Sequence, residues 1–181
     1  MNNEKANNRG ENKNSYENYI CVICSTQNQA VNFIPIHKYK FKKIYNLTIT
    51  EGSRFNNKIW DNNLKEGLKT FDINVDFEPI EFKQNEIVAG QQLYKTLKDK
   101  FENRDEPIFW NTTGGQRPFI LAMYRLYEHR KTQPNKKDDV LCYLEGNTAT
   151  MQIFSFEGDK PDAELTMDKY SLEKDLRIRH V

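Results

Sequence analysis

Short apolar runs alternate with amphipathic segments between residues 19 and 156, and this alternation limits the folds that the chain can adopt. Residues 19–24 are continuously apolar, which is typical of a parallel strand that is covered on both faces. Three more strands are predicted at 43–49, 73–82 and 107–110. Apolar residues at helical spacing predict helices over 27–39, 56–69, 87–101 and 119–127. Strands that alternate with helices in this way form an open α/β sheet.

The last two predicted strands, 140–144 and 149–156, form a hairpin around Glu145-Gly146-Asn147, so the sixth strand runs antiparallel to the fifth. Parallel strands that are joined by right-handed crossovers then give the order 3-2-1-4-5-6. We therefore predict a Rossmann-like, doubly wound, mainly parallel six-stranded sheet with helices on both faces. The winding direction reverses between strands one and four. Ligands of such sheets bind in the crevice at the carboxyl ends of those two strands.

The chain of 181 residues is expected to hold a single domain over residues 18–157. Residues 1–17 are mostly polar and contain no apolar run, which predicts a disordered N-terminal segment. Residues 158–181 are charged and weakly apolar, which predicts a C-terminal linker or tail. No apolar stretch is long enough for the core of a signal peptide or for a bilayer span, so we expect a cytoplasmic protein without membrane contact.

Charge and motif content exclude several classes of protein. A net charge of +1 argues against binding of duplex DNA through bulk positive charge. The three cysteines fit a reducing compartment, and Cys21 and Cys24 cannot chelate an ion together because they point to opposite faces of a strand. The three histidines are scattered, and neither a metal site nor a cofactor is predicted. The dinucleotide-binding, P-loop and nucleophile-elbow motifs are absent from the sequence.

A polar turn at the predicted crevice follows strand one and consists of Ser25-Thr26-Gln27-Asn28-Gln29. The side-chain amides of Asn28 and Gln29 both donate and accept hydrogen bonds, so they can recognise the edge of an adenine. The alternative is a helix-capping turn in which the hydroxyl of Ser25 or Thr26 accepts from early helix amides. We call this segment the first turn.

A second polar turn, Asn111-Thr112-Thr113-Gly114-Gly115-Gln116-Arg117, follows strand four and leads into a helix that opens at Pro118. Gly114 and Gly115 allow positive φ angles and a close approach of a ligand to the backbone. The amides at a helix N-terminus and the guanidinium of Arg117 suit a phosphate group. The alternative is a plain strand-to-helix turn that is capped by Thr113. Gly52, Ser53 and Arg54 follow strand two at the same sheet edge and could contact a larger ligand, or Ser53 could simply cap the next helix.

The two turns resemble the paired motifs of the CRISPR-associated Rossmann fold (CARF) family, and the likeness extends over residues 19–156. In that family a turn with Ser or Thr and Asn follows strand one, and an Asn-x-Thr-Gly-Gly-x-Lys-like turn follows strand four. The resemblance implies a homodimer that binds cyclic oligoadenylate, the tetra- or hexa-adenylate, in type III CRISPR antiviral defence. The phosphates would contact residues 114–117, and the adenines would contact Asn28 and Gln29.

Three functions remain open on this basis. The first is a sensor domain that regulates an effector module, which would lie in a longer chain or in a partner protein. The second is a metal-independent ring nuclease that cleaves the messenger through its ribose 2′-OH, with Ser25, Thr26, Gln116 and Arg117 stabilising the transition state. Arg117 stands where many relatives carry lysine and is a poorer proton donor, which weakens the case for lysine-dependent catalysis. The third is a dimerisation scaffold whose crevice serves no cyclic messenger.

Overall fold

A computed structural model describes residues 16–54, 57–136, 138–145, 150–155 and 164–169. The elements follow the order β1 (Ile20–Cys24), α1 (Ala30–Tyr39), β2 (Lys43–Glu51), α2 (Asn57–Thr70), β3 (Asp76–Lys83), α3 (Gln84–Val88), α4 (Gly90–Phe101), β4 (Ile108–Asn111), α5 (Arg117–Lys131), β5 (Val140–Glu145), β6 (Thr150–Ser155) and β7 (Glu164–Lys169). The predicted Glu145-Gly146-Asn147 turn and most of the predicted N-terminal segment lie outside the described residues. Tyr16, near the end of that segment, is buried and packs edge-on against Tyr39 and Phe109.

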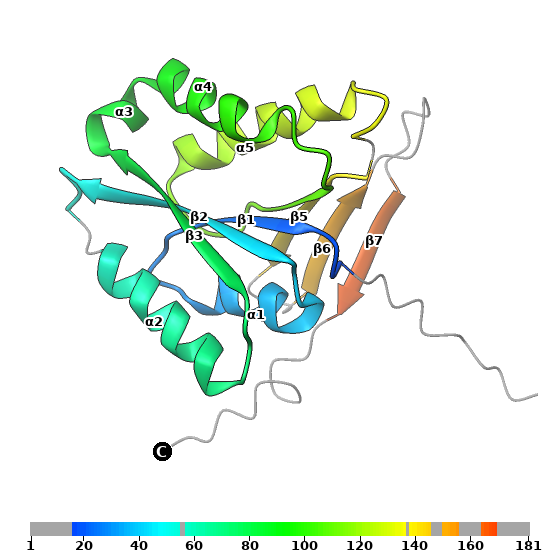
Figure 1. Cartoon of the computed structure of the whole chain (residues 1–181), viewed down its shortest axis with the longest axis horizontal. Coiled ribbons are helices and arrows are strands. Elements are labelled where there is room, and N and C mark those ends of the chain that lie inside the picture. Colours follow the sequence, from blue (N-terminus) through cyan, green and yellow to red (C-terminus); the bar gives the residue numbers. More distant parts are fainter. Residues whose placement is uncertain (1–15, 55–56, 137, 146–149, 156–163, 170–181) are drawn as a thin grey trace, which may run out of the picture.

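The strands form a single sheet in the order β3-β2-β1-β4-β5-β6-β7 (Figure 1). The five strands from β3 to β5 are parallel, and β6 runs antiparallel to β5. These findings confirm the predicted order of six strands. A seventh strand, β7, pairs antiparallel with β6 at the edge, within the segment that the sequence predicts as a linker or tail. Its sequence, ELTMDK, mixes charged and apolar residues and lacks the continuous apolar run by which the inner strands were predicted.

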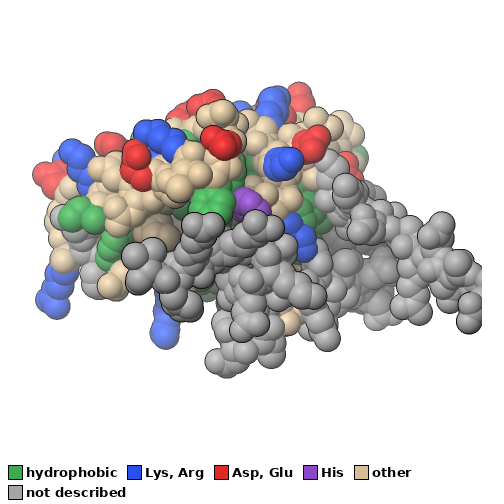
Figure 2. All heavy atoms as spheres, turned by 90° about the horizontal axis from the view of Figure 1, so that it is seen from below, with side chains coloured by type: hydrophobic (Ala, Val, Ile, Leu, Met, Phe, Trp, Pro, Cys, Tyr) green, Lys and Arg blue, Asp and Glu red, His purple; other side chains and the backbone are tan. Residues whose placement is uncertain are grey.

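Helices cover both faces of the sheet, with α1 and α2 on one side and α3, α4 and α5 on the other (Figure 1). Residues of β1 alternate between the two layers, so that Cys21 and Ile23 pack toward α1 whereas Val22 and Cys24 pack toward α5. The predicted opposite orientation of Cys21 and Cys24 is therefore confirmed. Figure 2 views the molecule from the side of α1 and α2, where acidic and basic side chains are interspersed rather than gathered by sign.

The helical pattern differs from the prediction at Ala89. The predicted helix over 87–101 is two helices, α3 and α4, which are separated at Ala89 by a non-helical backbone (φ −82°, ψ 69°). Pro35 lies inside α1, which continues past it to Tyr39. Proline removes one amide donor, the one that would have bonded to the carbonyl of Val31. That carbonyl accepts a hydrogen bond from Asn111 instead, which compensates for the missing donor.

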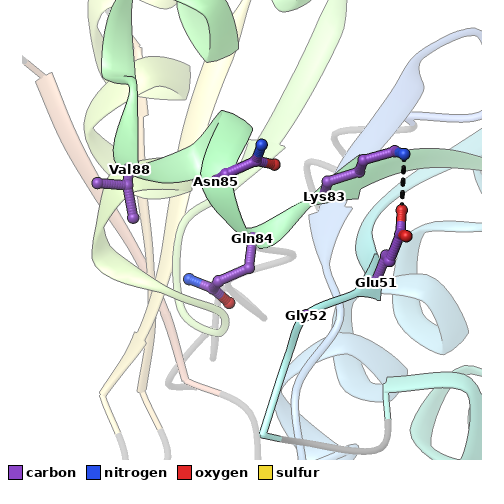
Figure 3. Close-up of a pocket in the computed structure, with 6 residues that line it drawn as sticks. All are labelled: Glu51, Gly52, Lys83, Gln84, Asn85 and Val88. Carbon is purple, nitrogen blue, oxygen red and sulfur yellow. Dashed lines mark ion pairs between the residues drawn. The ribbon is translucent and has the colours of Figure 1, made fainter.

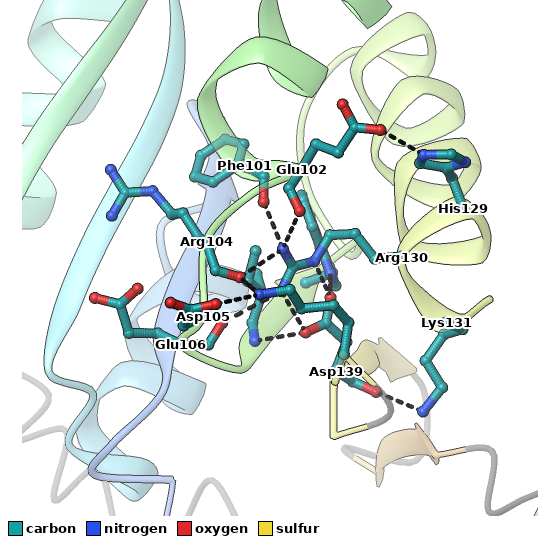
Figure 4. Close-up of polar contacts among 12 residues, drawn as sticks. Phe101, Glu102, Arg104, Asp105, Glu106, His129, Arg130, Lys131 and Asp139 are labelled. Atoms are coloured by element: carbon teal, nitrogen blue, oxygen red, sulfur yellow. Dashed lines mark hydrogen bonds and ion pairs between the residues drawn. The ribbon is translucent and has the colours of Figure 1, made fainter. Parts of the chain in front are cut away.

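A buried ion pair organises the amino edge of β4, opposite the predicted crevice (Figure 4). The Asp139 carboxylate accepts from Arg130 Nε at 2.7 Å and Nη2 at 3.0 Å, from the backbone N–H of Ile108 at 3.0 Å and from Trp110 Nε1 at 3.1 Å. Both charged side chains are completely buried. Arg130 donates in addition to carbonyl groups in and after α4, namely those of Phe101, Glu102, Arg104 and Glu106. This cluster therefore joins α4, α5, β4 and the segment that leads into β5.

Among the described residues, no helix combines the length and the hydrophobicity that a bilayer crossing requires.

Candidate functional site

The first and second turns are in direct contact at the carboxyl edge of β1 and β4, as predicted. Gly115 has a φ of +99°, and a Cβ atom added to it would lie 2.2 Å from Cys24 Cβ, at the end of β1. A Cβ atom on Gly114 would lie 2.8 Å from Thr26 Cγ2 and 2.9 Å from Val31 Cγ2. Both glycines are therefore required by close packing between the two turns, and Gly115 is required by its backbone conformation as well.

Hydrogen bonds of two buried side-chain amides, those of Asn32 and Asn111, connect the two turns. Asn32 in α1 donates to the carbonyl oxygen of Cys24 at 2.8 Å and accepts from Asn111 Nδ2 at 3.0 Å. Asn111 also donates to the Val31 carbonyl at 2.9 Å and accepts from the backbone N–H of Thr113 at 3.1 Å. Both asparagines are buried, so these bonds are shielded from water. Asn111 was predicted to contact ligand, but the contacts it makes hold the second turn in place.

The threonines of the second turn bond to β5. The Thr112 hydroxyl donates to the carbonyl of Cys142 at 2.9 Å, and the Thr113 hydroxyl accepts from the backbone N–H of Leu144 at 2.8 Å. Thr113 does not cap α5, because the residue at the N-cap position is Gln116, whose side chain makes no capping bond. The N-cap of α1 is Gln29, again without a side-chain capping bond. The capping alternatives for Thr113, Ser25 and Thr26 are therefore wrong.

The backbone of the second turn presents amide groups at the helix start. Within the described part of the chain, the N–H groups of Gly114, Gly115 and Gln116 donate no hydrogen bond. Arg117 begins α5, and its exposed side chain forms no ion pair with any described residue. Consecutive amides with open donors next to a helix N-terminus and a guanidinium form an arrangement that suits an anion.

A cavity of about 170 Å³ lies beside these amides. It is lined by Ser25, Thr26, Gln27, Ile49, Asn57, Trp60, Gly115, Gln116 and Phe119. We call it the notch. None of these side chains carries a formal charge. Five of them were predicted as site residues, namely Ser25, Thr26, Gln27, Gly115 and Gln116.

Ile49, Asn57, Trp60 and Phe119 were not predicted as site residues. Asn57 and Trp60 belong to the first turn of α2, which begins after β2 at the same edge of the sheet. Asn57 and Trp60 could have been predicted from their place at the start of α2, because each helix that follows a parallel strand starts at the ligand-binding edge.

Two buried polar atoms of the notch residues lack a hydrogen-bond partner among the described residues. They are Ser25 Oγ and Asn57 Oδ1. Ser25 is 8% exposed and Asn57 is 5% exposed. Buried polar atoms of folded proteins are nearly always hydrogen-bonded, because an unmade bond costs roughly 1–3 kcal/mol. Two such atoms around one cavity indicate a site that is complete only when a ligand or water is bound.

The remaining predicted residues do not line the notch. Asn28 is exposed, and Gln29 donates through Nε2 to the carbonyl of Thr26. Gly52, with a φ of +76°, lines an open hollow of about 520 Å³ with Glu51, Lys83, Gln84, Asn85 and Val88 (Figure 3). In that hollow Lys83 forms an ion pair with Glu51 at 2.7 Å. Arg54 is exposed and lines neither space, and Ser53 does not directly precede α2.

The cysteine beneath the second turn is protected from solvent. Burial raises the pKa of the Cys24 thiol, and burial likewise raises the pKa of Cys21 and of Cys142. The three thiols therefore stay protonated and unreactive at neutral pH. Among the described residues, no group of His, Cys, Asp or Glu side chains could hold a metal ion.

We expect the folded protein to resist alkylation at all three cysteines. Iodoacetamide at about pH 8, which is near the pKa of a free thiol, should leave the native chain unmodified after about an hour. The same reagent in roughly 6 M guanidinium chloride should modify every cysteine, and intact-mass spectrometry counts the modified cysteines. Selective labelling of Cys24 in the native protein would mean that the second turn separates from β1, which the close contact at Gly115 argues against.

Comparisons with known proteins identify the fold but not the family. No protein-family model matches the chain, and no curated protein matches its sequence. Its fold is similar to that of Can2 from Sulfobacillus thermosulfidooxidans, solved in complex with cyclic tetra-adenylate, with a TM-score of 0.57 and 14% identity over 80% of this chain. It is also similar to that of protein VC1899 from Vibrio cholerae, with a TM-score of 0.58 and 16% identity over 83% of this chain. The matched region spans 36% of the first protein and 35% of the second. At these identities the likeness establishes a shared α/β Rossmann-like fold.

Proposed function

We propose that this chain binds a cyclic oligoadenylate at the edge formed by the first and second turns. The observation that carries the proposal is the close approach of Gly115 to Cys24, which brings the open backbone amides of Gly115 and Gln116 beside a neutral notch. An oligoadenylate needs both kinds of surface, because its phosphates are anionic and its bases are neutral and flat. The cyclic tetra-adenylate that Can2 binds agrees with this chemistry.

The size of the notch supports a ligand that two copies of the chain share. A volume of about 170 Å³ is below the roughly 300–1,000 Å³ of sites that enclose a small molecule. A ring of repeating adenylates could lie on a twofold axis, so that each copy binds half of it. Leu121 and Tyr124, one to two turns into α5, are 69% and 50% exposed and offer apolar surface near the second turn for such a contact.

We further propose that binding regulates an effector module in type III CRISPR antiviral defence, carried by a longer chain or by a partner. The resemblance of both turns to CARF motifs supports this role. Cleavage of the ring is not part of the proposal. None of the notch side chains is a titratable acid or base that could take the proton of a ribose 2′-OH.

Isothermal titration with cyclic tetra- and hexa-adenylate tests the proposal. We expect saturable binding of one of the rings, with one ring for two chains. Arg117→Glu should weaken binding at least tenfold, because a guanidinium–phosphate contact contributes about 1.5–3 kcal/mol. Lys69→Glu is the control, since Lys69 is an exposed cation in the last turn of α2, away from the start of that helix, and should leave the affinity within about twofold. No heat with either ring, or equal losses in both variants, would contradict the proposal.

A further inference from the structure

We infer that the notch is a pocket for a single adenine base, with Asn57 as the residue that recognises the base and Trp60 as the surface on which it stacks. This inference rests on the proposed function and deepens it. Base recognition is thereby placed in α2, whereas the resemblance to the CARF motifs places it at Asn28 and Gln29. Neither of those two residues lines the notch, and Gln29 is already bonded to the carbonyl of Thr26.

The lining of the notch favours a base over a phosphate. Its side chains are uncharged, and its walls include the apolar side chains of Ile49 and Phe119. A phosphate that entered this space would lose its hydration without gaining a cation. Arg117 does not line the notch, and the open amides of Gly115 and Gln116 lie on the wall of the notch that leads into α5. The two parts of a nucleotide are thus matched to two neighbouring surfaces.

Asn57 is the polar group best suited to recognise adenine here. Its side chain is 5% exposed, and its Oδ1 atom has no hydrogen-bond partner among the described residues. A carboxamide pairs with adenine through two bonds, accepting from the N6 amino group and donating to N7. Ser25 Oγ, the second buried atom without a described partner, lines the same notch and can complete the recognition of the base. Binding of the base would give both atoms the partners they lack.

Trp60 supplies a flat surface at the same place. It lies three residues after Asn57 in α2, so the two side chains share one face of the helix. Its ring is partly exposed and lines the notch. Stacking on an aromatic ring stabilises bound bases whatever their identity, and hydrogen bonds to the base edge then discriminate among them. Trp60 is therefore expected to set affinity, and Asn57 to set specificity.

Tryptophan fluorescence provides a direct test, because the chain holds two tryptophans and the other, Trp110, is completely buried beside Asp139. Cyclic tetra-adenylate should quench the emission of the wild-type protein on binding. Trp60→Phe should abolish the quench while circular dichroism stays unchanged. Trp60→Ala should weaken binding about tenfold, as expected for the loss of one stacked base.

Cyclic tetra-inosinate, in which a carbonyl replaces the N6 amino group, tests recognition of the base. The wild-type protein should prefer the adenylate ring about tenfold or more. Asn57→Ala should remove that preference, and Asn63→Ala, at an exposed position of the same helix, should retain it. A quench that survives in Trp60→Phe, or a preference that survives in Asn57→Ala, would overturn the inference and leave the proposed function standing. Absence of binding to cyclic tetra-adenylate and to cyclic hexa-adenylate alike by the wild-type protein would overturn both.

Discussion

Asp139→Ala is expected to remove a large part of the stability of the folded chain. The carboxylate of Asp139 accepts two bonds from Arg130, one from Trp110 Nε1 and one from the Ile108 amide, all in a region without solvent exposure. Its loss leaves the guanidinium buried without a counter-charge. Breaking a buried pair in this way typically costs about 3–5 kcal/mol, against a total stability of about 5–15 kcal/mol for a domain.

Guanidinium chloride unfolding followed by far-UV circular dichroism measures this loss. Asp138→Ala is a control of the same chemistry at the preceding position, whose side chain is exposed, and it should change the free energy of unfolding by less than about 0.5 kcal/mol. Asp139→Asn keeps the shape of the side chain and should fall between the two. If the transition midpoint of Asp139→Ala matched that of Asp138→Ala, the account of this cluster would be wrong.

Gly115→Ala is expected to abolish ligand binding and to destabilise the chain. The added Cβ atom would lie 2.2 Å from Cys24 Cβ and 3.6 Å from Cys24 Cα, and neither atom can move without shifting β1. The φ of +99° adds backbone strain of about 1–3 kcal/mol for a residue with a side chain, and overpacking adds typically ~1–3 kcal/mol. The second turn must therefore move away from the first, which separates the amides from the notch.

Two other glycines provide a graded comparison. Gly114→Ala would meet the γ-methyl groups of Thr26 and Val31 at 2.8 and 2.9 Å. These β-branched side chains are stiff, but they can turn about χ1 without shifting β1, so the cost should be smaller than at Gly115. Gly90→Ala would meet no atom within 4 Å at the start of α4, so it should be neutral or stabilise by a few tenths of a kcal/mol. Both the melting temperature and the affinity for the cyclic ligand should fall in the order Gly90→Ala, Gly114→Ala and Gly115→Ala, with the largest losses in the last. Full binding by Gly115→Ala would contradict the proposed site.

The sheet and the meeting of the two turns could be predicted because both depend on local signals. Continuous apolar runs identify buried parallel strands, and crossover handedness then fixes their order. β7 could not be predicted in this way, because a charged edge strand lacks such a run. The division between α3 and α4 was also missed, since the helical spacing of Ile87, Tyr94 and Leu97 carries no sign of the turn at Ala89.

The candidate site was only partly predictable, because side chains far apart in sequence complete it. The first and second turns could be identified from their polar residues. The sequence does not show that Asn111 bonds to Asn32 and to the carbonyl of Val31, which lacks a donor because of Pro35. Asn57 appears in the sequence as an ordinary helix residue, and its role depends on where α2 begins relative to β1. Asp139 and Arg130 similarly resemble surface charges, and their burial follows from the packing of α5 against β4.

Hydrogen–deuterium exchange with and without cyclic tetra-adenylate tests the central claim most directly, because it locates the ligand as well as detecting it. Residues 25–29 and 111–117 should gain protection together, along with the start of α2, while the hollow around Phe71 and Asn74 at the opposite sheet edge should not change. Binding that protects that opposite hollow and leaves both turns unchanged would contradict the account.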